Sequence, residues 1–209
     1  GCGRPWLGME VLIVHPEKCE PLDDSEIGEI WVRGGSVASG YWNDPESTAQ
    51  VFEARLTGHT DVTYLRTGDL GFIRDGELYI TGRLKDLIII KGRNYYPQDI
   101  EALVHRICPE TFDPGYGAAF SVEGSDGSEE LVVAYEVRRE HRNSPLQDVV
   151  ATLVHAIESE FCVTVREFCV LKPASLMKTS SGKVQRRAMR AAYINDQLDT
   201  VYRCIPGTN

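Results

Sequence analysis

The sequence lacks the features that would place it in a membrane, outside the cell or around a metal ion. No window approaches about 18 consecutive apolar residues, so we expect no membrane span. It begins with Gly-Cys-Gly-Arg-Pro, which contains no apolar run of the kind found in signal peptides. The six cysteines form no Cys-x-x-Cys pair and no zinc spacing with histidine, which predicts reduced structural thiols, no metal site and a cytoplasmic location. Two of them, Cys162 and Cys169, lie in apolar stretches and are expected to be small buried side chains.

Positive charge is also scarce. The chain carries 31 acidic residues against 22 lysines and arginines, a net charge of −9 with neutral histidines. This balance argues against a general nucleic-acid-binding protein. The hydrophobic fraction of 42% is too high for a disordered chain, and 209 residues suit one domain or two small ones.

The first part of the chain is rich in strand and turn patterns. Residues 10–14, 29–33 and 77–81 are expected to form strands, and the Asp-Gly pair before the last of these is a hairpin signal. Asp44 is expected to cap a short helix whose first position is Pro45. Short strands separated by glycine-rich turns predict a small barrel or sheet.

After Gly82 the pattern changes to a mixture of helices and strands. We expect strands at residues 87–90, 118–122, 131–137 and 163–171. Helices are expected from Pro97 to the residue before Cys108, from a Ser-x-x-Gln capping box that begins at Ser144, and over about residues 184–198. The sequence therefore predicts an α+β fold: a small β-rich, barrel-like subdomain followed by a separate α+β domain, with a boundary at residues 83–86.

Two short motifs near this boundary carry polar groups that suit a ribose or a phosphate. In the Arg-Thr-Gly-Asp sequence at residues 66–69, the glycine permits a tight turn and the carboxylate of Asp69 can accept the two hydroxyl protons of a cis-diol. The Gly-Arg-Leu-Lys-Asp sequence at residues 82–86 can place the Arg83 guanidinium against ribose or phosphate oxygens. Each motif also has a plainer interpretation: an Asx-turn for the first, and a surface ion pair of Arg83 or Lys85 with Asp86 for the second.

The third feature is a local reversal of charge. Residues 172–190 contain six lysines and arginines and no acidic residue. Within this run, a Ser-Ser-Gly turn presents Lys183, whose ammonium could be delivered to a phosphate or a carboxylate. A solvated start of a basic helix and an RNA-binding patch are the alternatives. The run is not a P-loop, because a valine follows Lys183 where that motif needs serine or threonine.

The order and spacing of these motifs resemble the adenylate-forming superfamily, which includes acyl-CoA synthetases, nonribosomal-peptide adenylation domains and beetle luciferases. The resemblance runs through GEIWVRG at residues 28–34, SGYW at 39–42, RTGD at 66–69, GRLKD at 82–86 and SGK at 181–183. It covers nearly the whole chain.

Within the superfamily, the chain is most similar to the fatty acyl-AMP ligases. The resemblance lies in KDLIIIKGRNYYPQDIE at residues 85–101, LRTGDLGF at 65–72 and KTSSGK at 178–183. Acyl-CoA synthetases usually carry Gly-Gly where this chain has Gly92 and Arg93. The bulk and charge of Arg93 are a plausible reason for a ligase of this kind not to accept CoA.

The resemblance implies an enzyme that activates a fatty acid with ATP and Mg²⁺ to an acyl-adenylate and passes the acyl group to an acyl carrier protein. Asp69 would bind the ribose hydroxyls of ATP, and Arg83 would add a ribose contact. Lys183 would be the adenylation lysine, bridging the substrate carboxylate and the α-phosphate as charge develops. Lys85 would be the hinge about which the small domain rotates between the half-reactions.

The resemblance also implies a domain arrangement. Residues 1–82 would be the last, β-rich subdomain of a large adenylation domain, residues 83–86 the hinge, and residues 87–209 the mobile α+β carboxy-terminal domain. The phosphate loop, the Mg²⁺-binding glutamate and the fatty-acid tunnel of the family precede these motifs and are absent from the sequence. We therefore expect the chain to be a fragment that is inactive alone.

Three other functions remain open at this stage. An acyl-CoA synthetase of the same fold would differ in using CoA as the acyl acceptor. A binding module would use the chain only to dock a carrier protein, and the basic run at residues 172–190 could meet an acidic carrier in either case. An RNA-binding function is the least favoured, because the basic run lacks interleaved aromatic residues.

Overall fold

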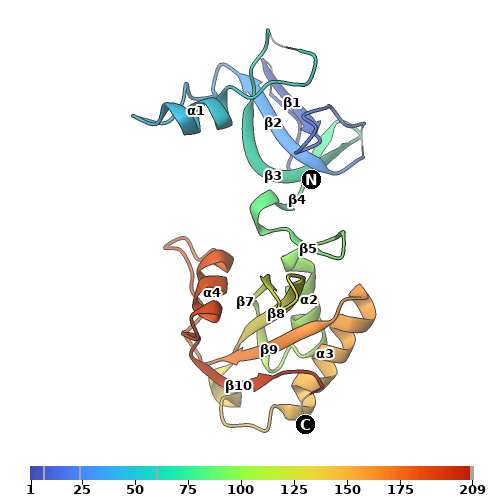
Figure 1. The fold of residues 1–209 in the computed structure, drawn as a ribbon, viewed down its shortest axis with the longest axis vertical. Helices are drawn as coiled ribbons and strands as arrows, with labels where there is room; N and C mark the ends of the chain where they lie inside the picture. Colours follow the sequence, from blue (N-terminus) through green and yellow to red (C-terminus); the bar gives the residue numbers. More distant parts are fainter. Residues whose placement is uncertain (7, 24, 60, 208–209) are drawn as a thin grey trace. The chain divides into compact units, whose positions relative to one another are not determined.

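The computed structural model describes residues 1–6, 8–23, 25–59 and 61–207. The chain forms two compact units, Gly1–Lys85 and Asp86–Asn209 (Figure 1). No helix in the described part of the chain is long and apolar enough to cross a membrane.

The first unit is built on one four-stranded antiparallel sheet in the order β1-β2-β3-β4. Its elements are β1 (Met9–Val14), β2 (Gly28–Gly34), α1 (Pro45–Phe52), β3 (Leu65–Arg74) and β4 (Glu77–Arg83). The described strands form an open sheet, so the barrel-like closure expected from the sequence is wrong. The reason lies at the edge of β4, where backbone groups of Cys2 and Gly3 pair with Leu78 at 2.7 and 2.9 Å and occupy that edge.

Local signals in this unit gave the expected structure. The side chain of Asp44 accepts a hydrogen bond from the backbone N–H of Ser47 at 2.9 Å, which caps α1 and lowers the pKa of that carboxyl. Trp31 on β2 is fully buried and packs with Val14, Leu56 and Tyr64 in the core of the unit.

The second unit is a four-stranded sheet in the order β10-β9-β8-β7, with helices on both faces and a separate hairpin of β5 and β6. Its elements are β5 (Ile88–Ile90), β6 (Arg93–Tyr95), α2 (Pro97–Ile107), β7 (Phe112–Glu123), β8 (Glu129–Val137), α3 (Gln147–Phe161), β9 (Val165–Leu171), α4 (Arg186–Ile194) and β10 (Thr200–Cys204), with the short 3₁₀ turns η1 (Leu84–Asp86) and η2 (Arg139–His141). Strands β8 and β9 are parallel and are joined through α3; the other neighbouring strands are antiparallel.

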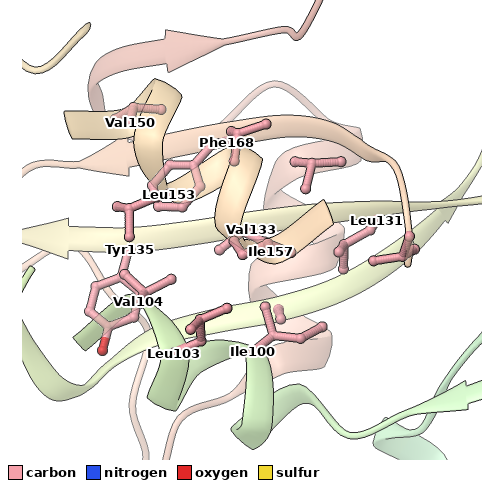
Figure 2. Packing of buried hydrophobic residues seen from close by; sticks show 14 of the residues in the cluster. Ile100, Leu103, Val104, Leu131, Val133, Tyr135, Val150, Leu153, Ile157 and Phe168 are labelled. Atoms are coloured by element: carbon pink, nitrogen blue, oxygen red, sulfur yellow. The ribbon is translucent and has the colours of Figure 1, made fainter. Parts of the chain in front are cut away.

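The alternation of side chains along β8 explains why both faces of this sheet need helices. Leu131, Val133 and Tyr135 face one core with α2 and α3, whereas Val132 and Ala134 face the other core with Met189 of α4. Figure 2 shows the first core, where α2 and α3 side chains meet the sheet. A strand buried on both faces has a continuous apolar sequence, as residues 131–135 of β8 do.

Several expectations about helix ends were wrong. Helix α3 begins at Gln147 after Leu146 and has no side-chain cap, so the Ser144 capping box does not form; the N–H of Ser144 instead donates to the carbonyl of His141. Helix α4 begins at Arg186, two residues later than expected, because Val184 forms a β-bridge with Lys178. The sequence pattern also missed β10.

Two expectations about burial were wrong as well. Cys169 is fully buried, and burial raises the pKa of its thiol, but Cys162 is exposed because it ends α3 in the left-handed conformation (φ 52°, ψ 44°). Ile89 is 52% exposed in the expected buried strand, because β5 belongs to a two-stranded hairpin and only Ile88 and Ile90 face the core.

Candidate functional site

In the first unit, the motif at residues 66–69 lies over a buried carboxylate. Glu29 on β2 is 2% exposed and accepts two hydrogen bonds from the Arg66 guanidinium at 2.9 and 2.6 Å. It also accepts from Trp31 Nε1 at 3.0 Å and from the backbone N–H of Gly68 at 3.2 Å. Because a buried charge must be paired and hydrogen-bonded, Glu29 fixes the path of β3 at this motif.

The turn before Asp69 is held by its own polar groups. Gly68 has φ +72°, a conformation that L residues rarely adopt. The Thr67 hydroxyl donates to the carbonyl of Ile30 at 2.7 Å and accepts from the N–H of Asp69 at 3.1 Å. This short hydroxyl contact replaces regular strand pairing and directs the Asp69 side chain to the surface, where it is 38% exposed.

Asp69 and Arg83, the two residues assigned to ribose by resemblance, are neighbours. They are cross-strand partners of β3 and β4, and Arg83 Nε donates to Asp69 Oδ1 at 3.0 Å. The plainer interpretation of an Arg83 pair with Asp86 is not observed, because Asp86 faces Arg186. The arrangement can present a carboxylate that accepts hydroxyl protons beside a guanidinium that donates to oxygen.

In the second unit, Lys183 lies on a hydrogen-bonded loop that leads to α4. The N–H of Thr179 donates to the carbonyl of Lys183 at 2.8 Å, and the N–H of Gly182 donates to the carbonyl of Thr179 at 2.9 Å. The N–H of Lys183 donates to Thr179 Oγ1 at 3.1 Å. The Lys183 side chain is exposed, and no ion pair joins it to any residue that the structure describes. It is therefore available to a negatively charged group.

The neighbouring lysine has a different environment. Lys178 Nζ lies 3.2 Å from the centre of the Tyr116 ring, a cation–π contact. Tyr116 belongs to a segment of β7 that bulges out between Phe112 and Gly117. Lys178 thus contacts its own unit, whereas Lys183 is presented outwards.

Arg186 anchors the loop where α4 begins. Its Nε and Nη2 donate to the two carboxylate oxygens of Glu101 on α2 at 2.7 and 2.6 Å, and its Nη1 lies 3.6 Å from Asp86. Burial acts to lower the pKa of Arg186, but the hydrogen bonds and charges of Glu101 and Asp86 outweigh it and raise that pKa.

The two remaining predicted residues are exposed. Lys85 lies in η1, directly before Asp86. Arg93 begins β6 after a turn in which Lys91 and Gly92 both have positive φ, and it lines an open groove of about 700 Å³ with Asp126 and Arg166.

Sequence reasoning missed Glu29, Glu101 and the pairing role of Arg186. A glutamate between apolar residues of a strand was the available signal for Glu29. Glu101 entered the sequence-based predictions only as the last residue of the motif at residues 85–101, and its partner Arg186 lies 85 positions away, which no local pattern reveals.

The comparisons with known proteins agree with this arrangement. The chain is 45% identical over 202 residues to the medium-chain-fatty-acid–[acyl-carrier-protein] ligase JamA of Moorena producens (strain JHB), covering 95% of this chain and 33% of JamA. Among solved structures, it resembles one from a study of fatty acyl-adenylate ligases from E. coli and L. pneumophila (TM-score 0.75, 32% identity, 93% of this chain and 32% of the other). It also resembles ATP-bound MatB from Rhodopseudomonas palustris (TM-score 0.74, 26% identity, 93% and 36%).

These matches, together with the fold and the motifs, define the class as the adenylate-forming enzymes, and the chain spans about a third of the length of these relatives. Residues 1–42 match the model of the AMP-binding enzyme family. The chain belongs to the family described as Disco-interacting protein 2-like, AMP domain, whose model matches residues 85–203.

Proposed function

We propose that this chain is the carboxy-terminal part of an ATP-dependent ligase that converts a fatty acid to an acyl-adenylate and passes the acyl group to an acyl carrier protein. The observation that carries the proposal is the joint presence of the exposed Asp69–Arg83 pair and the exposed Lys183 on a hydrogen-bonded loop. The similarity to ligases whose names include fatty acids and a carrier protein supports the same function.

ATP supplies the adenylyl group of this reaction. The Asp69 carboxylate would accept hydrogen bonds from the ribose hydroxyls, and the Arg83 guanidinium would donate to a ribose oxygen. The Lys183 ammonium would stabilise the negative charge that develops between the fatty-acid carboxylate and the α-phosphate. The described residues contain no group of three or more acidic, histidine or cysteine side chains that could hold a metal ion.

We further propose that Lys85 is the hinge between residues 1–82 and 87–209. The change between half-reactions would be absorbed by a few backbone dihedrals of residues 83–86, within and beside η1. Because the chain spans about a third of its relatives, the 209 residues alone should not form acyl-adenylate. Fatty-acid-dependent pyrophosphate exchange by these residues alone would contradict this expectation.

The experiment that tests the function uses the full-length protein containing this chain. It is incubated with ATP, Mg²⁺, dodecanoic acid and CoA, and the products are resolved by mass. We expect acyl-adenylate to accumulate without acyl-CoA, and Arg93→Gly to allow some acyl-CoA to form because the CoA arm could then approach the bare backbone. Abundant acyl-CoA from the unchanged protein would instead make it an acyl-CoA synthetase.

A further inference from the structure

The start of α4 is an unusual place for a largely buried arginine. Helix α4 has Arg186 and Arg187 in its first turn and no acidic residue there, which opposes the helix dipole. Arg186 is nevertheless only 20% exposed at its side chain. Something outside the helix must therefore compensate this charge.

Glu101 provides the compensation. Its side chain is 10% exposed, and both of its oxygens accept from Arg186 in a two-point contact. Oε1 also accepts from the backbone N–H of Ala119 on β7 at 3.0 Å, so the carboxylate itself is held by the sheet. This contact fixes the position of the guanidinium and hence the chain that carries it.

The same guanidinium connects two segments that the function needs. Lys183 lies three residues before Arg186, and the N–H of Gln185 between them donates to the carbonyl of Met177 at 2.9 Å, which closes the loop. Asp86, 3.6 Å from Arg186 Nη1, directly follows Lys85. The lysine loop and the segment after Lys85 are thus both attached to one guanidinium.

We propose that Arg186 is a positioning residue that fixes the Lys183 loop to α2 and to the segment following Lys85, so that these parts move as one rigid body. The inference rests on the proposed adenylation function of Lys183. Glu101 sets the place of the guanidinium, and Asp86 is the weaker partner, because its distance exceeds that of a hydrogen bond.

The first test measures amide hydrogen exchange in the 209-residue chain by NMR. In Arg186→Lys, which keeps the charge but loses the two-point contact, we expect the amides of Thr179, Gly182 and Lys183 to lose protection by about tenfold. Glu101→Gln should lower the protection of the same amides, although its side-chain oxygen can still accept from the N–H of Ala119. Amides of the central strand β8 should keep their protection, which shows that the fold is intact.

Arg106→Lys is the matched control. Arg106 and Glu160 are joined at the same 2.6 Å, but their side chains are 64% and 46% exposed. This variant should leave the loop amides unchanged. If the loop amides exchange at the same rates in Arg186→Lys and Glu101→Gln as in Arg106→Lys, Arg186 does not hold the loop and the inference is wrong.

The second test measures adenylation in the full-length ligase. A displaced Lys183 would lose stabilisation of the transition state, so kcat of Arg186→Lys should fall about tenfold or more while KM for ATP stays within about twofold. A loosened loop with unchanged kcat would overturn the positioning role. If the unchanged protein forms no acyl-adenylate, the proposed function fails, whereas the exchange measurement still decides whether Arg186 holds the loop.

Discussion

Asp69 and Arg83 form an ion pair at the surface. Because the pair is exposed, we expect its removal to weaken ligand binding much more than it lowers the stability of the fold. Exposed ion pairs contribute about 0–1 kcal/mol to folding, whereas hydrogen bonds from a ligand to a charged group contribute about 1.5–3 kcal/mol. We expect Asp69→Ala to lower kcat/KM for ATP about 10- to 100-fold in the full-length protein, with an almost unchanged melting temperature. Calorimetry and steady-state kinetics measure the two quantities.

The control for this prediction is another exposed pair on the same sheet. Glu10 and Arg33 are cross-strand partners of β1 and β2 and lie 2.7 Å apart. Glu10 also accepts a hydrogen bond from the hydroxyl of the buried Tyr64 at 3.2 Å, so the control is Glu10→Gln, which keeps an acceptor there. Glu10→Gln should change neither the kinetics nor, by more than about 1 kcal/mol, the stability. Equal kinetic losses in Glu10→Gln and Asp69→Ala would argue against a ribose contact by Asp69.

Lys183 should act mainly in the transition state of adenylation. Removing one group that stabilises developing charge typically costs about 10²–10³ in kcat. We expect Lys183→Ala to show this loss in pyrophosphate release, yet still to transfer the acyl group from supplied acyl-adenylate to the carrier protein. Lys18, an exposed lysine of the first unit, offers the control Lys18→Ala. Equal loss of both half-reactions in Lys183→Ala would contradict an adenylation-specific role.

At the scale of elements, the sequence predicted those whose signals are local. Asp44 marked the start of α1, Pro97 that of α2, and the turn at Asp75 marked the β3–β4 hairpin. The errors arose where a partner outside the helical or strand pattern decided the outcome. Val184 satisfied a helical pattern but pairs with Lys178, and β10 is short and only half-buried, so its weak pattern is completed by pairing with β9.

The end of α3 allows a prediction about stability. Cys162 holds a left-handed conformation that costs an L residue about 1 kcal/mol, and its thiol makes only a long contact of 3.9 Å with the carbonyl of Ser159. We expect Cys162→Gly to raise the free energy of unfolding by about 0.5–1 kcal/mol, measured by urea denaturation. Cys162→Ser, which keeps the Cβ atom, should give no such gain. A less stable glycine variant would contradict this prediction. It would mean that glycine raises the conformational entropy of the unfolded chain by more than the relief of strain stabilises the folded state.

At the scale of the whole molecule, the order of the motifs could be read from the sequence, but the contacts that support them could not. The serial spacing from residues 28–34 to 181–183 indicated the superfamily without any knowledge of the fold. The carboxylates of Glu29 and Glu101, which hold Arg66 and Arg186, lie far from their partners in sequence. Such pairs depend on burial and on strand pairing, and a local residue pattern does not show which distant residues will meet.

The charge distribution of the chain leads to a prediction about the proposed carrier protein. The net charge is −9, yet residues 172–190 carry six positive charges and no negative one, beside the Lys183 loop. An acidic carrier protein would be attracted to this run, and charges at a surface are screened over about 10 Å at 0.1 M salt. Lys172 is ion-paired with Asp199, so Arg187 and Arg190 are the better probes of the run. We expect KM for the carrier protein to rise several-fold between about 50 and 300 mM NaCl, and this dependence to weaken in Arg187→Gln with Arg190→Gln.

Pyrophosphate release measured over the same salt range separates docking from catalysis, because adenylation precedes the encounter with the carrier in the proposed reaction. Arg142 is an exposed arginine outside the run, so Arg142→Gln should retain the full salt dependence. A KM that does not respond to salt would mean that the carrier protein is held by apolar contacts and that the basic run has another role. A salt dependence that persists after both substitutions in the run would place the electrostatic contact elsewhere on the ligase.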